Sequence, residues 1–338
     1  MEYTRLGSSG LEVSRICMGA MSFGDRAEGQ QWLIDEDEAF PIVKHALELG
    51  INFFDTANVY NGGRSEEILG EALRQYASRD DYVLATKVWG RVRPGPNGAG
   101  LSRAAIMGEI DKSLKRLKMD YVDLYILHRW DYDVPIEETM EAMNDVVRAG
   151  KARYIGSSAM MAWQFAKTLS TCERHGWTKP VSMQNHYNLI YREEEREMNP
   201  LCVSAGVGTT PYSPLASGRL ARDFKNVQTP RAEHDAIAKW KYDATADADQ
   251  AVIDRVAELA EKHGVARAQI ALAWILRKAP VSAPIVGASR GNYLDEAAGA
   301  FEVHLTAEEI TYLEETYVPH AVMGPTPYPT SLTRPVNE

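Results

Sequence analysis

Residues 121–128 read YVDLYILH: a short apolar run, Val122–Leu127, that ends directly in a histidine. A run of this length is too short for a helix and is typical of a strand buried on both faces of a parallel sheet. The same pattern recurs along the chain in both directions. The eight candidate strands are Ser14–Met18, Ile51–Phe54, Tyr82–Ala85, Val122–Leu127, Ala152–Ile155, Val181–Met183, Val207–Thr210 and Val281–Val286.

Longer amphipathic stretches lie between these runs. In Ser102–Leu117, for example, Ile106, Ile110 and Leu114 recur at the spacing of one helix face. The expected helices are Asp37–Leu49, Glu66–Tyr76, Ser102–Leu117, Pro135–Ala149, Met161–His175, Arg192–Ser204, Asp249–His263 and Ala268–Leu276. Eight alternations of strand and helix predict an α/β protein with a (β/α)₈ TIM barrel; an open, doubly wound sheet is the alternative.

Four segments fall outside this alternation. Tyr3–Val13 predicts a small β-hairpin that caps the bottom of the barrel. Trp89–Leu101 and Pro214–Ala248 predict long loops after strands three and seven, on the face where barrel active sites lie. Tyr317–Glu338 predicts an extended tail on the surface. No domain boundary is visible, so we expect residues 1–338 to form a single domain.

Composition and charge favour a cytoplasmic enzyme. The chain has 37 basic and 47 acidic residues and a net charge of −10, which argues against binding to nucleic acid or to an anionic membrane. We expect no membrane span and no signal peptide, because no run of about 18 apolar residues and no basic, then apolar, leader is present. Cys17, Cys172 and Cys202 lack metal-binding spacing and predict buried, reduced thiols, with no metal site.

Ionisable side chains follow three consecutive apolar runs. Asp55 follows INFF, Lys87 follows YVLAT, and His128 follows VDLYIL; Tyr60 lies five residues after Asp55. Each alone could be structural: a turn-capping aspartate, a solvated lysine, a core histidine or a surface tyrosine. Catalytic groups gather at the carboxyl ends of barrel strands, however, so their joint occurrence there favours an active site.

These four side chains would form a tuned proton donor. A phenol ordinarily has a pKa near about 10, and a nearby ammonium lowers that pKa. We therefore expect Lys87 to tune Tyr60, Asp55 to anchor Lys87, and His128 to orient a carbonyl oxygen. Proton donation to a developing alkoxide is the step that carbonyl reduction requires.

A nucleotide phosphate site is expected after strands seven and eight. The first strand is followed by GAMSFG, which does not fit the G-x-G-x-x-G fingerprint of a Rossmann site. Barrels often bind phosphate with the loops after strands seven and eight, and both of these loops combine Gly, Ser and Arg here. Arg219 and Arg290 are the candidate phosphate ligands, with ordinary exposed arginines as the alternative.

Several segments resemble the aldo-keto reductase superfamily, in order and over nearly the whole chain. They include GINFFDTANVYNGGRSEEILGEAL, YVLATKVWG, MDYVDLYILHRWD and GKARYIGSS; REEEREM and SPLASGRLAR resemble the bacterial and fungal oxidoreductase branch related to potassium-channel β subunits. The resemblance implies a (β/α)₈ barrel, NADPH as cofactor and hydride transfer to aldehydes or ketones. It also implies that Asp55, Tyr60, Lys87 and His128 are the catalytic tetrad.

The resemblance further implies cofactor contacts. Ser158 and Gln184 would hold the nicotinamide carboxamide, and Tyr212 would stack on the ring. The pyrophosphate would lie against Ser213, Pro214, Leu215, Ser217, Gly218 and Arg219, and the adenosine end against Gly287, Ser289, Arg290, Tyr293 and Glu296. The sequence departs from the family pattern at Ala159, Tyr293, Ala297, Ser217 and Gly291, and Ala159 stands where the family usually has Asn.

Phe23, Trp89 and Trp130 are the candidate substrate-binding residues, because they follow strands one, three and four. Aromatic walls favour apolar or aromatic carbonyl compounds; the alternative is that some of these rings pack under the loops. The run Arg192–Glu197 predicts a solvated helix start.

Two other functions compete with a reductase. One is an NADPH-binding regulatory or sensory subunit with little turnover, and the other is an aldolase or isomerase in which Lys87 forms a Schiff base. The oligomeric state stays open.

Overall fold

The structure is a computed structural model that describes residues 1–26, 30–223 and 234–325. Eight parallel strands form one sheet in the order β10-β3-β4-β5-β6-β7-β8-β9. Their bounds are β3 Cys17–Gly19, β4 Phe53–Asp55, β5 Val83–Val88, β6 Val122–Leu127, β7 Ala152–Ser158, β8 Ser182–Gln184, β9 Gly208–Thr209 and β10 Ile285–Gly287. All eight predicted runs therefore contribute a strand.

The two edges of this sheet meet and close a barrel. Thr209 of β9 pairs in parallel with Val281, just before β10, and the backbone N–H of Ile285 donates to the carbonyl of Pro211 at 2.8 Å. A closed ring of parallel strands is a (β/α)₈ barrel, which confirms the predicted fold and excludes the open sheet.

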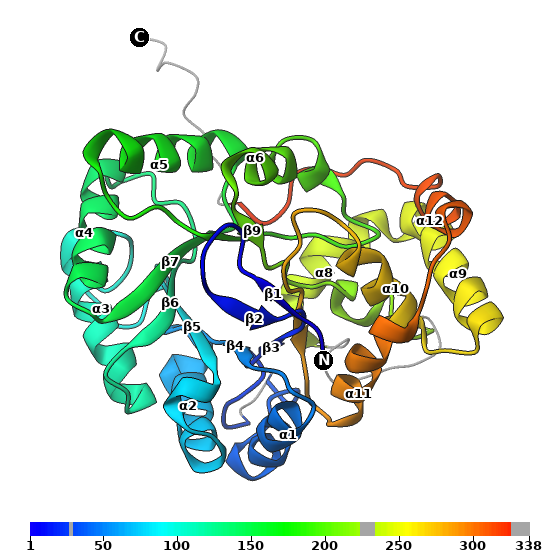
Figure 1. The fold of residues 1–338 in the computed structure, drawn as a ribbon, viewed down its shortest axis with the longest axis horizontal. Coiled ribbons are helices and arrows are strands. Elements are labelled where there is room, and N and C mark those ends of the chain that lie inside the picture. The colour runs from blue at the N-terminus through cyan, green and yellow to red at the C-terminus, as the bar shows by residue number, and fades with distance from the viewer. Residues whose placement is uncertain (27–29, 224–233, 326–338) are drawn as a thin grey trace, which may run out of the picture.

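Helices surround the sheet (Figure 1). They are α1 Glu36–Glu48, α2 Arg64–Tyr76, α3 Arg103–Leu117, α4 Ile136–Arg148, α5 Ala162–His175, α6 Met198–Ala205, α8 Ala236–Tyr242, α9 Ala246–His263, α10 Arg267–Leu276, α11 Asn292–Gly299 and α12 Ala307–Glu314. Local sequence sets their ends. At α3 the hydroxyl of Ser102 accepts a hydrogen bond from the N–H of Ala105, and Lys118 ends the helix in a left-handed conformation.

Two predicted segments differ from the structure. The expected helix Arg192–Ser204 is split into a 3₁₀ turn, Glu193–Glu195, and the short α6. Pro200 explains the break, because proline lacks an N–H and fits only in the first turn of a helix, where α6 places it. The expected loop Pro214–Ala248 contains α8 and the first turn of α9, and its residues 224–233 lie outside the described part of the chain.

The predicted hairpin, β1 Tyr3–Arg5 and β2 Glu12–Ser14, lies over the centre of the barrel (Figure 1). Leu6 and Val13 belong to the same buried cluster as Phe53 and Leu124 inside the barrel. Gly7 makes the close fit possible: its φ is +60°, and a Cβ there would stand 2.5 Å from the backbone nitrogen of Gly208. The hairpin thus fills the barrel end opposite the carboxyl ends of the strands.

The described part of the C-terminal tail is bound to the barrel rather than only draped over it. The ring of Tyr317 stacks on that of His320 with centroids 5.5 Å apart, and His320 forms a buried pair with Asp249 of α9 at 2.8 Å. The N–H of Met323 donates to the hydroxyl of Tyr191 at 2.8 Å. Residues 326–338 of the predicted tail lie outside the described residues.

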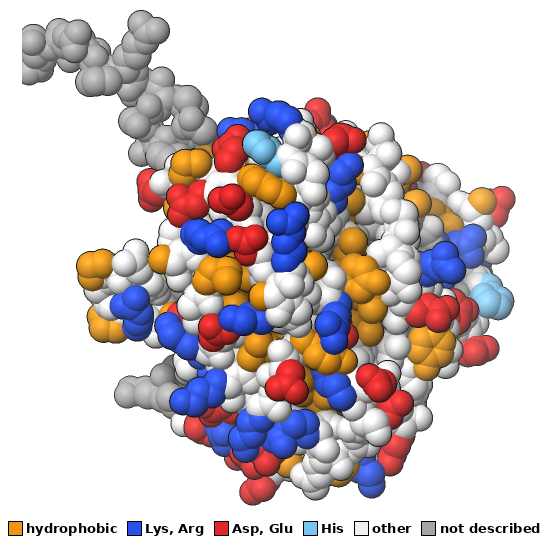
Figure 2. Space-filling model, turned by 60° about the vertical axis from the view of Figure 1, so that its left-hand side comes forward, with side chains coloured by type: hydrophobic (Ala, Val, Ile, Leu, Met, Phe, Trp, Pro, Cys, Tyr) orange, Lys and Arg blue, Asp and Glu red, His pale blue; other side chains and the backbone are white. Residues whose placement is uncertain are grey.

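The surface and the cysteines agree with the composition. Figure 2 shows Lys and Arg side chains intermixed with Asp and Glu over one face, with hydrophobic side chains in scattered patches. Cys17, Cys172 and Cys202 are buried and form no disulfide. Within the described residues, no helix combines the length and apolar character needed to cross a membrane.

Candidate active site

The four predicted catalytic side chains come from three adjacent strands. Asp55 is the last residue of β4, Lys87 lies one residue before the end of β5, and His128 follows β6. Tyr60 begins a 3₁₀ turn, Tyr60–Gly63, in the loop after β4. Strands β4, β5 and β6 are hydrogen-bonded neighbours, so their carboxyl ends place these side chains at one mouth of the barrel.

Lys87 is the hub of the group. Its side chain is fully buried, and its Nζ lies 2.5 Å from Oδ1 of Asp55, 2.7 Å from the carbonyl oxygen of Thr56 and 3.2 Å from the hydroxyl of Tyr60. Three acceptors for an ammonium that has three donors leave no proton unsatisfied. The ammonium therefore has one fixed position, directly beside the phenol.

Two opposing effects set the protonation of this group. Burial raises the pKa of Tyr60 above its ordinary value, and the Lys87 ammonium only partly offsets this. For Lys87, burial is the largest effect and acts to lower the pKa, but the charges and hydrogen bonds of Asp55 and Tyr60 together outweigh it and the net direction is upward. The lysine is thus a cation and the phenol is protonated at neutral pH. The predicted lowering by Lys87 is present, but desolvation is the larger effect on the pKa of Tyr60.

His128 is a neutral imidazole beside the phenol. Its ring meets that of Tyr60 edge to face, with centroids 5.7 Å apart. Burial, followed by the positive charges of Lys87 and Arg129, lowers the pKa of His128 well below its ordinary value. Its Nδ1 is buried and has no hydrogen-bond partner among the described residues. A neutral ring can present one N–H to an oxygen without adding a charge.

Gln184 adds a contact that sequence analysis missed. Its Nε2 donates to Oδ2 of Asp55 at 2.9 Å, while Oδ1 of the same carboxylate accepts from Lys87. The two residues are 129 positions apart, and the only sequence signal is that Gln184, like Asp55, is the last residue of a short strand.

The three residues predicted to hold the nicotinamide lie after neighbouring strands. Ser158 ends β7, Gln184 ends β8 directly beside it in register, and Tyr212 follows β9. The Tyr212 ring lies parallel to that of His186, with centroids 5.3 Å apart, and His186 stacks in turn on Tyr191 at 4.1 Å. The Nζ of Lys241 also lies over the Tyr212 ring, 4.4 Å from its centroid, so a planar ligand that extends this stack would have to displace Lys241.

Ala159 is the clearest departure from the family pattern, and its backbone is unusual. Its φ is +44°, in the left-handed region that Asn tolerates better than Ala does. Its N–H donates to the carbonyl of Gln184 at 3.0 Å. The backbone at this position thus has a conformation suited to Asn, although the residue is Ala and has no side-chain amide.

The predicted pyrophosphate loop has a strained backbone. Ser213, Ala216 and Ser217 all have φ values between +48° and +54°, and Gly218 has a φ of +98°. Non-glycine residues with positive φ cost energy and cluster where a loop is held for function. Successive left-handed residues also turn backbone N–H groups toward one side, which suits an anion. The loop also contains Pro214, which is buried, and Leu215, which is partly buried.

The two candidate phosphate ligands differ in environment. Arg219 is buried, donates to Asp243 at 2.6 Å and lies over the ring of Tyr242. Arg290 is exposed; its backbone carbonyl accepts the N–H of Tyr293, but its guanidinium has no ion pair or hydrogen bond among the described residues. The other residues predicted at the adenosine end are the exposed Gly287 and Ser289, and the partly exposed Tyr293 and Glu296 of α11.

The three predicted substrate residues also differ in exposure. Phe23 is fully buried and Trp130 is 7% exposed, so both pack under the loops, which was the alternative reading. Trp89 is partly exposed. Trp163, which sequence analysis missed, is 51% exposed and packs against Trp130 with ring centroids 5.8 Å apart. The sequence signal for Trp163 is an aromatic residue five positions after β7, the fifth barrel strand in chain order.

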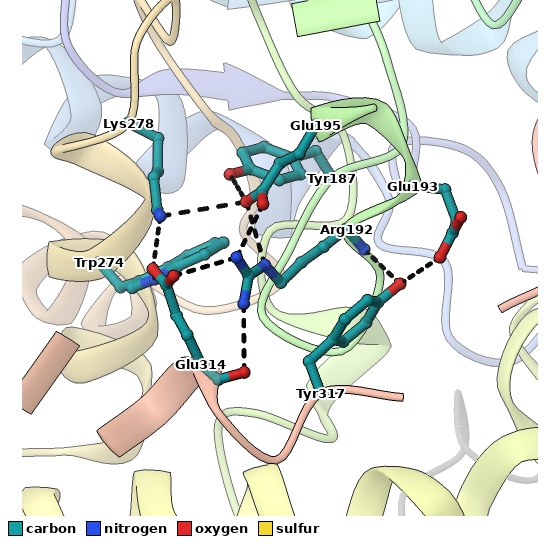
Figure 3. Close-up of polar contacts among 8 residues, drawn as sticks. All are labelled: Tyr187, Arg192, Glu193, Glu195, Trp274, Lys278, Glu314 and Tyr317. Carbon is teal, nitrogen blue, oxygen red and sulfur yellow. Dashed lines mark hydrogen bonds and ion pairs between the residues drawn. The ribbon is translucent and has the colours of Figure 1, made fainter. Parts of the chain in front are cut away.

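The run Arg192–Glu197 is only in part the predicted solvated helix start: Arg196 and Glu197 are exposed next to α6, but Glu194 is buried. Arg192 donates to the carboxylates of Glu195 and Glu314, whereas the hydroxyl of Tyr317 donates to Glu193 and accepts from the N–H of Arg192 (Figure 3). Most of this cluster is partly buried, and its partners come from α10, α12 and the tail. The cluster holds these elements together. Its charged groups, which were predicted to be hydrated, form hydrogen bonds with other protein residues instead.

The chain matches the family model of the aldo/keto reductase family over residues 15–318. It is similar to versiconal hemiacetal acetate reductase of Aspergillus parasiticus, with 45% identity over 95% of this chain and 98% of the relative. It is also similar to a putative aryl-alcohol dehydrogenase of Schizosaccharomyces pombe, with 42% identity over 95% of this chain and 97% of the relative. A putative aryl-alcohol dehydrogenase of Saccharomyces cerevisiae, AAD16, is 38% identical over 94% of this chain and 98% of the relative.

Proposed function

Because this chain belongs to the aldo/keto reductase family, we propose that it reduces aldehyde or ketone carbonyls to alcohols with NADPH, and that Tyr60 is the general acid. Family membership and the reductases among its relatives support an oxidoreductase that uses a nicotinamide cofactor and a small carbonyl substrate. NADPH, rather than NADH, and the roles of individual residues are our proposals.

The observation that carries the proposal is the contact of the Tyr60 hydroxyl with the buried Lys87 ammonium at 3.2 Å. A protonated phenol beside a fixed cation can give its proton to a developing alkoxide, and the cation stabilises the phenolate that remains. Asp55 keeps the lysine charged and in place. The neutral ring of His128 is free to donate an N–H to the same carbonyl oxygen and orient it.

The residues around this group fit a nicotinamide. Ser158 and Gln184 would hold its carboxamide and Tyr212 would lie against its ring, while the strained loop Ser213–Gly218 would hold the pyrophosphate. Arg290, whose exposed guanidinium has no partner among the described residues, is our proposed ligand of the 2′-phosphate. When bound, NADPH supplies the hydride.

We propose apolar or aromatic carbonyl compounds as substrates. Trp89 and the exposed Trp163, which packs on Trp130, follow strands on the face that carries Tyr60. The aryl-alcohol dehydrogenases among the relatives are named for aromatic alcohols. We also propose that the protein acts in the cytoplasm as one barrel domain and binds neither nucleic acid nor membranes.

Both alternatives are less well supported. A Schiff base needs a neutral amine, but the raised pKa of Lys87 keeps the ammonium charged, and all three of its donors are already used. A regulatory subunit needs no proton donor, whereas the complete set of Asp55, Tyr60, Lys87 and His128 is assembled here.

The test is a fluorescence titration with NADPH and NADH, followed by turnover with a panel of benzaldehydes, aliphatic aldehydes and ketones. We expect tighter NADPH binding and oxidation of NADPH that depends on the carbonyl compound. Tight binding without turnover across the panel would favour the regulatory subunit. A lysine adduct trapped by borohydride at Lys87 would favour the aldolase.

A further inference from the structure

We propose that Gln184 is a positioning residue for Asp55 and, through it, for the Lys87–Tyr60 pair. This inference rests on the proposed function, in which Tyr60 is the proton donor. It gives Gln184 a second task besides holding the carboxamide, so that one side chain would link the cofactor to the acid.

The contact crosses the barrel. Asp55 ends β4 and Gln184 ends β8, and these strands lie four places apart in either direction around the closed sheet. The 2.9 Å hydrogen bond therefore joins opposite walls, whereas Lys87 reaches Asp55 from the adjacent strand β5. Two donors from different directions fix both oxygens of one carboxylate.

Asp55 depends on this second donor. The residue is only 3% exposed, and among the described residues Gln184 is the one side chain that donates to its Oδ2. A buried carboxylate oxygen without a hydrogen-bond donor is costly in free energy. Without Gln184, we therefore expect the Asp55 side chain to rotate toward another donor. Any such turn moves Oδ1, to which the Lys87 ammonium is tied.

Gln184 is itself held in place. It is 3% exposed, it pairs in register with Ser158, and its backbone carbonyl accepts the N–H of Ala159 at 3.0 Å. Its Nε2 is committed to Asp55, whereas its side-chain oxygen has no donor among the described residues. That oxygen is left to accept an amide N–H, which the nicotinamide carboxamide offers next to Ser158.

The link has a chemical consequence. The charge of the Asp55 carboxylate raises the pKa of the Tyr60 phenol. The hydrogen bond from Gln184 partly neutralises that carboxylate and so weakens its effect on the phenol. Loss of the donor should leave Asp55 more negative toward the phenol and less fixed in position. Both changes weaken a proton donor whose geometry must be exact to a fraction of an ångström.

The experiment compares Gln184→Met with Ser158→Ala. Methionine keeps the length of the side chain but has no donor, so kcat at saturating NADPH should fall about tenfold or more, the scale of one charged hydrogen bond. In the cofactor-free protein, Tyr60 labelled at Cζ with ¹³C should titrate at higher pH than in the wild type. Ser158→Ala removes a proposed carboxamide contact without touching Asp55; it should weaken NADPH binding and leave the Tyr60 titration unchanged.

Gln184→Glu gives an independent test, which can be used if the Gln184→Met protein folds poorly. At low pH the new carboxyl is protonated and donates to Asp55, which rescues activity. Above its pKa, two buried carboxylates face each other and activity should fall at a lower pH than in the wild type.

A Gln184→Met protein that binds NADPH weakly but keeps the wild-type kcat and Tyr60 titration would overturn the inference. If the wild type reduces no carbonyl compound, the proposed function fails, yet the titration in the free protein still decides the role of Gln184.

Discussion

The Nζ of Lys87 lies 3.2 Å from the hydroxyl of Tyr60, inside a barrel wall where the lysine has no exposed surface. Burial on its own would make the phenol a weaker acid and the ammonium a stronger one. The Lys87 cation partly offsets burial for the phenol, because it favours phenolate, and Asp55 together with Tyr60 offsets burial for the ammonium. The pair is thus an acid whose strength depends on a single short contact.

Removal of the phenolic hydroxyl should abolish most turnover but not cofactor binding. Tyr60→Phe keeps the ring that meets His128 edge to face, so the packing survives. We expect NADPH affinity within about twofold of the wild type and kcat for carbonyl reduction at least about 10²-fold lower, the usual scale of general acid catalysis. Fluorescence titration and steady-state kinetics measure the two quantities; unchanged turnover would remove Tyr60 from the acid role.

The two candidate arginines should behave differently. Arg290→Ala removes an exposed guanidinium, and we expect NADPH affinity to fall about tenfold or more with little change for NADH. Arg219→Ala breaks the contact with Asp243 inside the loop after β9, so it should weaken both cofactors alike. Parallel titrations of the two variants with both cofactors provide the comparison. Equal losses in Arg290→Ala would show that Arg290 does not contact the 2′-phosphate.

Glu194 should make the protein less stable at alkaline pH. Burial raises the pKa of this carboxyl to about 8, so the folded protein holds a proton that the unfolded chain has lost above about pH 4.5. Its contribution to the free energy of unfolding therefore declines as pH rises from about 4.5 to 8. Glu194→Gln should be more stable than the wild type by about 1–3 kcal/mol at pH 8 and nearly equal at pH 4.5. Denaturant unfolding at the two pH values measures this; the same difference at both would contradict the assignment.

His320 should hold the C-terminal tail more firmly at acid pH. Burial is the largest effect and lowers the pKa of this imidazole, but the hydrogen bond and charge of Asp249, with smaller contributions from Val318 and Glu193, together outweigh it and the net direction is upward. Such a group contributes fully below its unfolded pKa of about 6.5, and the contribution is lost as pH rises through the higher folded value. A double-mutant cycle of His320→Gln and Asp249→Asn should give a coupling of about 1 kcal/mol at pH 5.5 that shrinks by pH 8.5. Tyr317, Glu193 and His186 also face this group, so a cycle is needed to isolate the pair.

The fold and the four-residue group could be predicted because both depend on local patterns. A short apolar run such as Val122–Leu127 has few alternatives to a buried strand, and the residue that follows it must lie at the carboxyl end of that strand. Asp55, Lys87 and His128 therefore meet once the strands are placed side by side in chain order, as right-handed strand–helix units require.

The partners of buried polar groups could not be predicted. Gln184 and Asp55 are 129 residues apart, Arg192 and Glu314 are 122 apart, and His320 and Asp249 are 71 apart. An acidic run such as Glu193–Glu195 has the same composition whether water or a helix covers it, and Phe23 looks equally suited to a pocket or a core. The order of the strands and the ionisable groups that follow them can be predicted from local sequence, because each apolar run and the residue after it are adjacent in the chain. Only the closed barrel decided which opposite walls meet and which charges lose their water, because both depend on distances between segments remote in the chain.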